Sequence, residues 1–75
     1  MQANIQYVLE SVMKALQNKN VWMVKRTLSL LNTIDRSSTL WAKVDEHVVR
    51  SGIAPLGLLK VKQRLEDSLS RENPE

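Results

Sequence analysis

Apolar residues recur along this chain at spacings of three and four, and no segment alternates strictly between apolar and polar positions. The first clear stripe lies between Asn4 and Gln17 and consists of Ile5, Val8, Leu9, Val12 and Leu16. Such spacing places the apolar side chains on one face of a helix, with charged and amide side chains opposite. The pattern predicts an amphipathic helix over residues 4–17, with Tyr7 and Met13 widening the apolar stripe.

Three further segments, over residues 21–34, 39–51 and 55–70, repeat this period. The segment 21–34 is apolar around about half of its circumference, at 100° per residue. We therefore expect it to be the central helix, in contact with two neighbours. The segment 39–51 buries Leu40, Val44 and Val48, with Trp41 as a core or core-edge residue, and the segment 55–70 buries Leu58, Val61, Leu65 and Leu69.

The breaks between these segments contain residues that end or begin helices. Asn18 to Asn20 forms a tight turn, because asparagine tolerates the left-handed conformation and also caps the following helix. Asp35 to Ser38 is a second set of capping residues. Gly52 ends the third helix, with Ile53 placed for the apolar contact of a Schellman ending, and Pro55 suits the first residue of the fourth.

These patterns predict an all-α fold, a compact bundle of four short amphipathic helices. With 75 residues the chain has room for a single domain, which we place at residues 1–72, followed by a frayed tail at 73–75. Since the chain has no cysteine, disulfide frameworks and cysteine-ligated zinc are excluded. No apolar run approaches the ~20 residues that span a bilayer, and polar residues follow Met1, so we expect a soluble, cytoplasmic protein without membrane contact.

The net charge of +3 is unevenly distributed. Residues 1–64 hold ten basic and four acidic side chains, a net charge of +6, whereas the last eleven residues carry −3. A basic body attracts phosphate groups or acidic protein surfaces, although a solvated surface that only keeps the protein in solution has the same composition.

Enzymatic chemistry has little support. His47 is the single histidine, and its neighbours Asp45 and Glu46 point in different directions on a helix. There is no cysteine nucleophile and no glycine-rich phosphate loop. We expect a protein that is not an enzyme and has no cofactor or metal, with His47 partly buried at the edge of the core.

The leading candidate for a binding site is on the polar half of the second helix. Trp22 lies there with Lys25, Arg26 and Ser29. An exposed tryptophan beside two cations suits a protein partner, because Trp and Arg are enriched where binding energy concentrates. Two alternatives stay open: an arginine covers the ring in a cation–π contact, or the N-terminal residues cover it.

The segment 44–63 supports a second interpretation, a helix-turn-helix with its turn at Gly52. The fourth helix would then enter the major groove of DNA with Lys60, Gln63 and Arg64, while Lys43 and Arg50 would touch the DNA backbone. Against this, polar His47 and Ser51 occupy positions that should be apolar, and Asp67 lies on the reading face. Any two amphipathic helices joined by glycine give a similar outline.

Leu56 and Trp22 look surplus to a four-helix core, which favours a homodimer or a complex with another protein. Taken together, the chain is predicted to be a small regulatory or adaptor protein that presents a basic, tryptophan-bearing helical surface to a protein partner. The alternative is a DNA-binding protein of the helix-turn-helix type.

Overall fold

The computed structural model describes residues 4–18 and 20–72, which form four helices and contain no strand. The helices are α1 (Ile5–Asn18), α2 (Val21–Asn32), α3 (Thr39–Arg50) and α4 (Leu58–Glu72). The predicted all-α class is therefore confirmed. The frayed tail predicted at residues 73–75 lies outside the described residues, as does the middle residue of the turn between α1 and α2.

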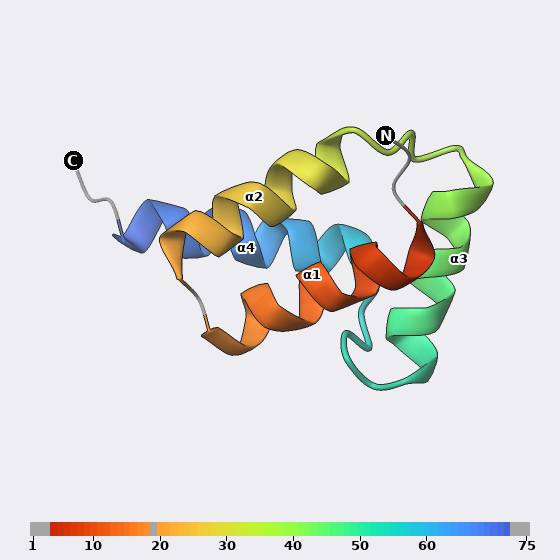
Figure 1. Cartoon of the computed structure of the whole chain (residues 1–75). Helices are drawn as coiled ribbons and strands as arrows, with labels where there is room; N and C mark the ends of the chain where they lie inside the picture. The colour runs from red at the N-terminus through yellow and green to blue at the C-terminus, as the bar shows by residue number, and fades with distance from the viewer. Residues whose placement is uncertain (1–3, 19, 73–75) are drawn as a thin grey trace.

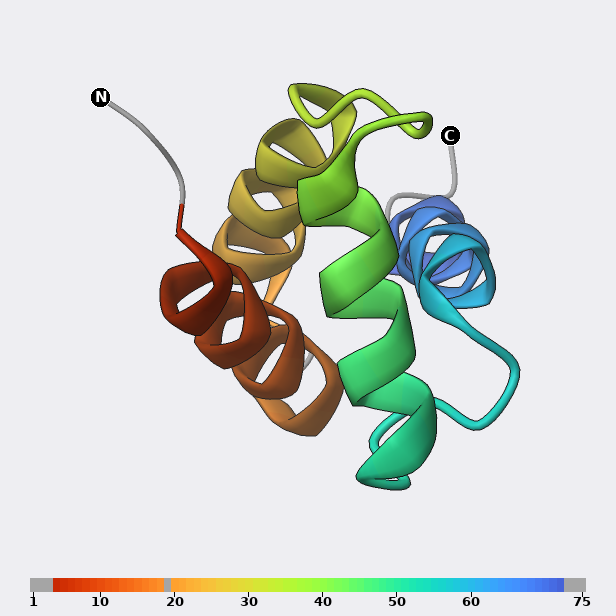
Figure 2. The ribbon, with the colours of Figure 1, turned by 90° about the vertical axis from the view of Figure 1, so that its right-hand side faces the viewer.

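Three of the helices run alongside one another and the fourth crosses them. Figure 1 shows α1, α2 and α4 extended in the same general direction, and Figure 2 looks along them with α3 lying across their ends. Helices α1 and α4 each contact the three other helices, whereas α2 contacts α1 and α4. The prediction of two neighbours for α2 is confirmed, but its central place is not, because α1 and α4 have more partners.

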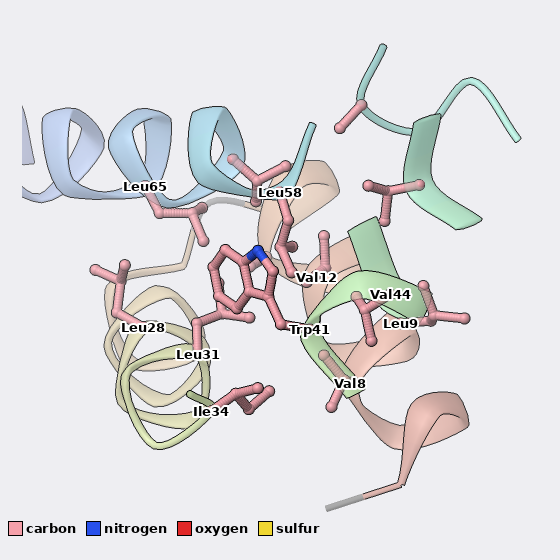
Figure 3. Close-up of a cluster of buried hydrophobic side chains, with 14 of the residues drawn as sticks. Val8, Leu9, Val12, Leu28, Leu31, Ile34, Trp41, Val44, Leu58 and Leu65 are labelled. Atoms are coloured by element: carbon pink, nitrogen blue, oxygen red, sulfur yellow. The ribbon is translucent and has the colours of Figure 1, made fainter. Parts of the chain in front are cut away.

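The core fills the space enclosed by all four helices (Figure 3). Trp41 is 9% exposed, and Figure 3 shows its indole ring in the middle of aliphatic side chains from the other helices. Its prediction as a core residue is confirmed. The buried apolar residues are Val8, Leu9, Val12, Ala15, Val24, Leu28, Leu31, Ile34, Trp41, Val44, Val48, Ala54, Leu58, Val61 and Leu65.

Two of the predicted helix boundaries are set by capping side chains, as expected. The side-chain oxygen of Asn20 accepts hydrogen bonds from the backbone N–H groups of Trp22 (2.9 Å) and Met23 (3.3 Å), which starts α2. The hydroxyl of Ser38 accepts a hydrogen bond from the N–H of Trp41 (3.1 Å), which starts α3. These bonds satisfy N–H groups that have no partner within the helix.

The connection between α3 and α4 differs from the prediction. Gly52 has a φ of +81° and follows the end of α3, as expected. The N–H that returns to the carbonyl of Val48 comes from Ala54, one residue later than in a Schellman ending. Helix α4 then begins at Leu58, so the prediction that Pro55 is its first residue is wrong.

The cause of this later start is a contact from α3. Oδ1 of Asp45 accepts a hydrogen bond of 2.7 Å from the N–H of Leu58, and Gly57 before it has a φ of +100°. The connection therefore spans seven residues, 51–57, instead of the three or four of a helix-turn-helix. The predicted short turn is wrong, because a side chain from another helix decides where α4 begins.

His47 is exposed, so its predicted partial burial is also wrong. The buried residues of α3 form a narrow stripe of Trp41, Val44 and Val48, since this helix crosses the ends of the others. At 100° per residue, His47 lies about 90° from the centre of that stripe. It lies near Lys43 and Arg50 at a shallow surface depression.

Candidate functional site

The outer face of α2 carries the predicted partner-binding residues. Trp22, Lys25, Arg26 and Ser29 are all exposed, while Val24, Thr27, Leu28 and Leu31 point into the protein. The spacings of three and four between the exposed residues place them on one face. Trp22 is 66% exposed, so the N-terminal residues that the structure describes, from Asn4 on, do not cover it; residues 1–3 lie outside the described part of the chain.

Arg26 lies next to two aromatic rings. Its guanidinium carbon is 5.4 Å from the centre of the Trp22 ring and 5.7 Å from that of Tyr7. One guanidinium nitrogen donates a hydrogen bond of 2.7 Å to the hydroxyl of Tyr7. Within about 6 Å, a guanidinium is attracted by the electron-rich face of an aromatic ring. The cation–π alternative is therefore present, and it leaves most of the Trp22 ring accessible.

Tyr7 belongs to α1 and was not predicted as part of this site. It was assigned to the widened apolar stripe, yet its side chain is 36% exposed and contacts Arg26, 19 residues away. The tight turn predicted between these two helices was the signal that could have indicated this contact, because a tight turn places α1 and α2 side by side. Hydrophobic periodicity does not fix how far each helix is rotated, so the partner of Arg26 could not be read from it. We call Tyr7, Trp22, Lys25, Arg26 and Ser29 the Trp22 surface.

A second contact fixes the two helices of this site relative to each other. The hydroxyl of Thr27 donates a hydrogen bond of 3.2 Å to the backbone carbonyl of Ser11. Thr27 is buried directly beneath the exposed face of α2, next to Arg26 in the sequence. This bond and the hydrogen bond from Arg26 to Tyr7 both join α1 to α2. Two hydrogen bonds therefore fix the position of Tyr7 relative to Arg26.

No carboxylate of the described residues forms an ion pair with the Trp22 surface. Over residues 4–18 and 20–71, the one ion pair joins the guanidinium of Arg50 to the carboxylate of Glu46, at 3.5 Å. Arg26 has five N–H donors, and one of its nitrogens donates a hydrogen bond to the Tyr7 hydroxyl. The guanidinium is therefore ordered by its neighbours and keeps its charge available for an acceptor from outside.

The five residues predicted to contact DNA are all exposed, but they divide into two groups. Lys43 and Arg50 lie at the depression beside His47 on α3. Lys60 and Arg64 of α4 lie at a different hollow, which also includes Leu16 of α1. The amide oxygen of Gln63 accepts a hydrogen bond from Lys60 (3.5 Å), so two of the three side chains that were predicted to enter the major groove contact each other.

The part of the chain that the structure describes contains no group of three or more His, Asp or Glu side chains placed to hold a metal ion. Among the same residues, no helix has the length and apolar character needed to cross a membrane.

Comparisons with protein-family models, with curated proteins and with solved structures find no match to this chain. Its function is therefore inferred from the geometry of its own side chains.

Proposed function

We propose that this protein is a small regulatory or adaptor protein that binds a protein partner through the Trp22 surface. The observation that carries this proposal is that Trp22 is 66% exposed while its neighbour Arg26 is held in place by Tyr7. Exposing an indole to water is unfavourable, and the free energy is recovered when a partner covers the ring.

The order already present at this surface favours tight binding. A free arginine side chain loses rotamer freedom when a partner immobilises it, at a cost of about 0.5–1.5 kcal/mol. Arg26 is already restrained by its contacts with Trp22 and Tyr7, so part of its rotamer freedom is lost on folding and not on binding. Tryptophan and arginine side chains in such a position commonly contribute about 2 kcal/mol or more to an interface.

The test begins by finding the partner. A photo-crosslinking amino acid placed at the exposed Ser29 should capture a protein in an extract of the source cells. Purified partner is then titrated against the Trp22→Ala, Arg26→Ala double variant. We expect affinity at least about thirtyfold weaker, which corresponds to ~2 kcal/mol, with unchanged helicity by circular dichroism.

The matched control is the Lys43→Ala, Val49→Ala double variant. It also removes one cation and one exposed apolar side chain, but from α3. We expect its affinity to equal that of the unmodified protein. Equal losses of binding and helicity in the Trp22 variant would show that the two residues are structural and would overturn the proposal.

The DNA-binding alternative is separated by its response to salt. A labelled generic duplex is titrated at low and near-physiological ionic strength. Phosphate contacts weaken steeply as salt increases, whereas an apolar interface does not. Tight, salt-sensitive binding that Lys60→Ala and Arg64→Ala remove, with no effect of the Trp22 variant, would replace the proposed function by nucleic-acid binding.

A further inference from the structure

A groove runs along α4 on the side that faces the C-terminal half of α1. It consists of two adjoining hollows that share Leu16 and Arg64. Apolar side chains of Leu16, Ile53 and Leu65 line it, and Lys60, Arg64 and Arg71 follow its α4 side. We call this the α1–α4 groove. None of its lining residues belongs to the Trp22 surface.

The three cations of the groove are in register on one helix. They lie four and seven residues apart, which places them along one side of α4. Lys60 and Arg71 are separated by about 16 Å, at 1.5 Å per residue, or three helical turns. Within residues 4–18 and 20–71, none of the three is within 4.0 Å of a carboxylate oxygen, although Asp67 lies on the same side of α4 between Arg64 and Arg71.

At one end of the groove, the connection between α3 and α4 adds a large apolar side chain. Leu56 is 73% exposed and lines the hollow together with Pro55. The groove thus combines an apolar lining with a row of cations and has no acidic residue among those that line it. We propose that the α1–α4 groove binds an acidic amphipathic helix of a protein partner.

The choice of a helix follows from the backbone. An extended peptide binds by adding a strand to a sheet edge or, as a polyproline helix, by docking in an aromatic-lined groove; the described part of this chain has no sheet, and no aromatic residue lines the groove. An amphipathic helix satisfies its own backbone hydrogen bonds and places its apolar side chains in a groove between helices. Glutamates beside those apolar side chains would meet Lys60, Arg64 and Arg71 over three turns.

Other occupants fit less well. A second copy of this chain could not present its α2 face to the groove, because the exposed apolar residues of α2 are accompanied by Lys25 and Arg26 rather than by acids. A nucleic acid would use the cations but not the apolar lining of Leu16, Ile53 and Leu65.

The test uses a fluorescently labelled peptide of about 18 residues, with leucines at helical spacing and glutamates beside them, titrated against the full chain. We expect saturable binding and chemical-shift changes in ¹⁵N spectra at Leu56, Arg64 and Ser68. A peptide of the same composition in scrambled order should bind at least about tenfold more weakly, because its acids and leucines no longer share one face.

Charge-reversal variants locate the contact. Arg64→Glu, and independently Lys60→Glu, should each weaken binding at least about tenfold. Lys43→Glu changes the net charge equally but lies outside the groove, so it should have little effect. A peptide with lysines in place of the glutamates should bind the double variant Lys60→Glu, Arg64→Glu better than it binds the unmodified protein.

Four results would overturn the proposal. The first is that the scrambled peptide binds as tightly as the helical one, and the second is that Lys43→Glu weakens binding as much as Arg64→Glu does. The third is that chemical-shift changes are confined to residues 22–29. The fourth is that sedimentation equilibrium shows a dimer that Leu56→Ser dissociates. Salt-sensitive binding of duplex DNA that Arg64→Glu removes, without peptide binding, would likewise replace it with a nucleic-acid site. The Trp22 surface takes no part in this binding. A negative result for the α1–α4 groove would therefore say nothing against the function proposed above, which has a separate test.

Discussion

Asp45 of α3 caps α4, because its Oδ1 accepts a hydrogen bond from the backbone N–H of Leu58 at 2.7 Å. The two residues are 13 positions apart, and the carboxylate also places a negative charge at the positive end of the α4 dipole. Gly57 lets the carboxylate approach, since a Cβ at this position would lie 3.0 Å from Oδ1. One side chain of α3 thus fixes both the start of α4 and the path of the chain before it.

Replacing the cap should destabilise the protein measurably. Asp45→Ala removes the acceptor for the Leu58 N–H, and loss of a helix cap costs about 1 kcal/mol of unfolding free energy. For a domain of this size, that corresponds to a decrease in Tm of about 4–8 °C. Urea unfolding followed by circular dichroism measures the change.

The adjacent acid provides the control. Glu46 is exposed and forms an ion pair with Arg50, four residues away on the same helix. Exposed pairs of this kind contribute about 0.3–0.5 kcal/mol, so Glu46→Ala should change stability by no more than that. If both substitutions had the same effect, the carboxylate of Asp45 would not act as a cap.

The two glycines of the connection should differ in their tolerance of alanine. Both have a positive φ, +81° at Gly52 and +100° at Gly57, so each substitution strains the backbone by roughly 1 kcal/mol or more. A Cβ at Gly52 meets no atom within 4 Å, whereas one at Gly57 meets Asp45 Oδ1. We therefore expect Gly57→Ala to destabilise the protein about twice as much as Gly52→Ala in the same unfolding experiment.

The two tryptophans should report on different environments. Trp41 is 9% exposed and Trp22 66%. In the variant Trp22→Phe, the remaining indole should emit at shorter wavelength and resist quenching by iodide. In Trp41→Phe, the remaining indole should emit at longer wavelength and be quenched readily.

Their contributions to stability should differ in the same way. Truncating a buried tryptophan costs about 3–5 kcal/mol, a large part of the stability of a small domain. Trp41→Ala should therefore leave much of the protein unfolded at 25 °C. Trp22→Ala should change the unfolding free energy by about 0.5 kcal/mol or less, since surface substitutions generally do. A large loss in the second variant would contradict the exposed position of Trp22.

Asp35 should give the protein a weak dependence on acid pH. The backbone N–H of Ser37 (3.0 Å), and then its hydroxyl (2.9 Å), donate to Asp35 Oδ1 and hold the pKa of this carboxyl below its ordinary value of 3.8. A lowered pKa in the folded state stabilises the protein above the unfolded pKa. This stabilisation is lost as the pH falls through the folded pKa.

A ¹³C titration of the Asp35 carboxyl measures that shift. Its midpoint should lie below that of the unfolded chain, and Ser37→Ala should move it part of the way back, because the backbone donor remains. The difference in stability between the protein and Asp35→Asn should shrink as the pH falls below the folded pKa. An unchanged difference would mean that the two hydrogen bonds have no effect on folding.

The Trp22 surface shows how much of a binding site sequence patterns can predict. Trp22, Lys25, Arg26 and Ser29 were predicted to share an exposed face, and they do, because the direction of a side chain on a single helix follows from 3.6 residues per turn. Tyr7 was missed, because its contact with Arg26 depends on how α1 is rotated against α2. His47 was misplaced for a similar reason, since the width of the buried stripe on α3 depends on what that helix crosses.

The sequence alone determined the four helices, most of their core residues and two of their caps, because periodic hydrophobicity and capping chemistry act within a few residues of the chain. Only the tertiary structure decided that α4 begins at Leu58 instead of Pro55, that Arg26 lies against Tyr7, and that Leu16 and Arg64 line one groove. Each of these contacts joins different elements of the fold. Their geometry depends on how the helices cross and rotate when the whole core packs, which no local pattern specifies.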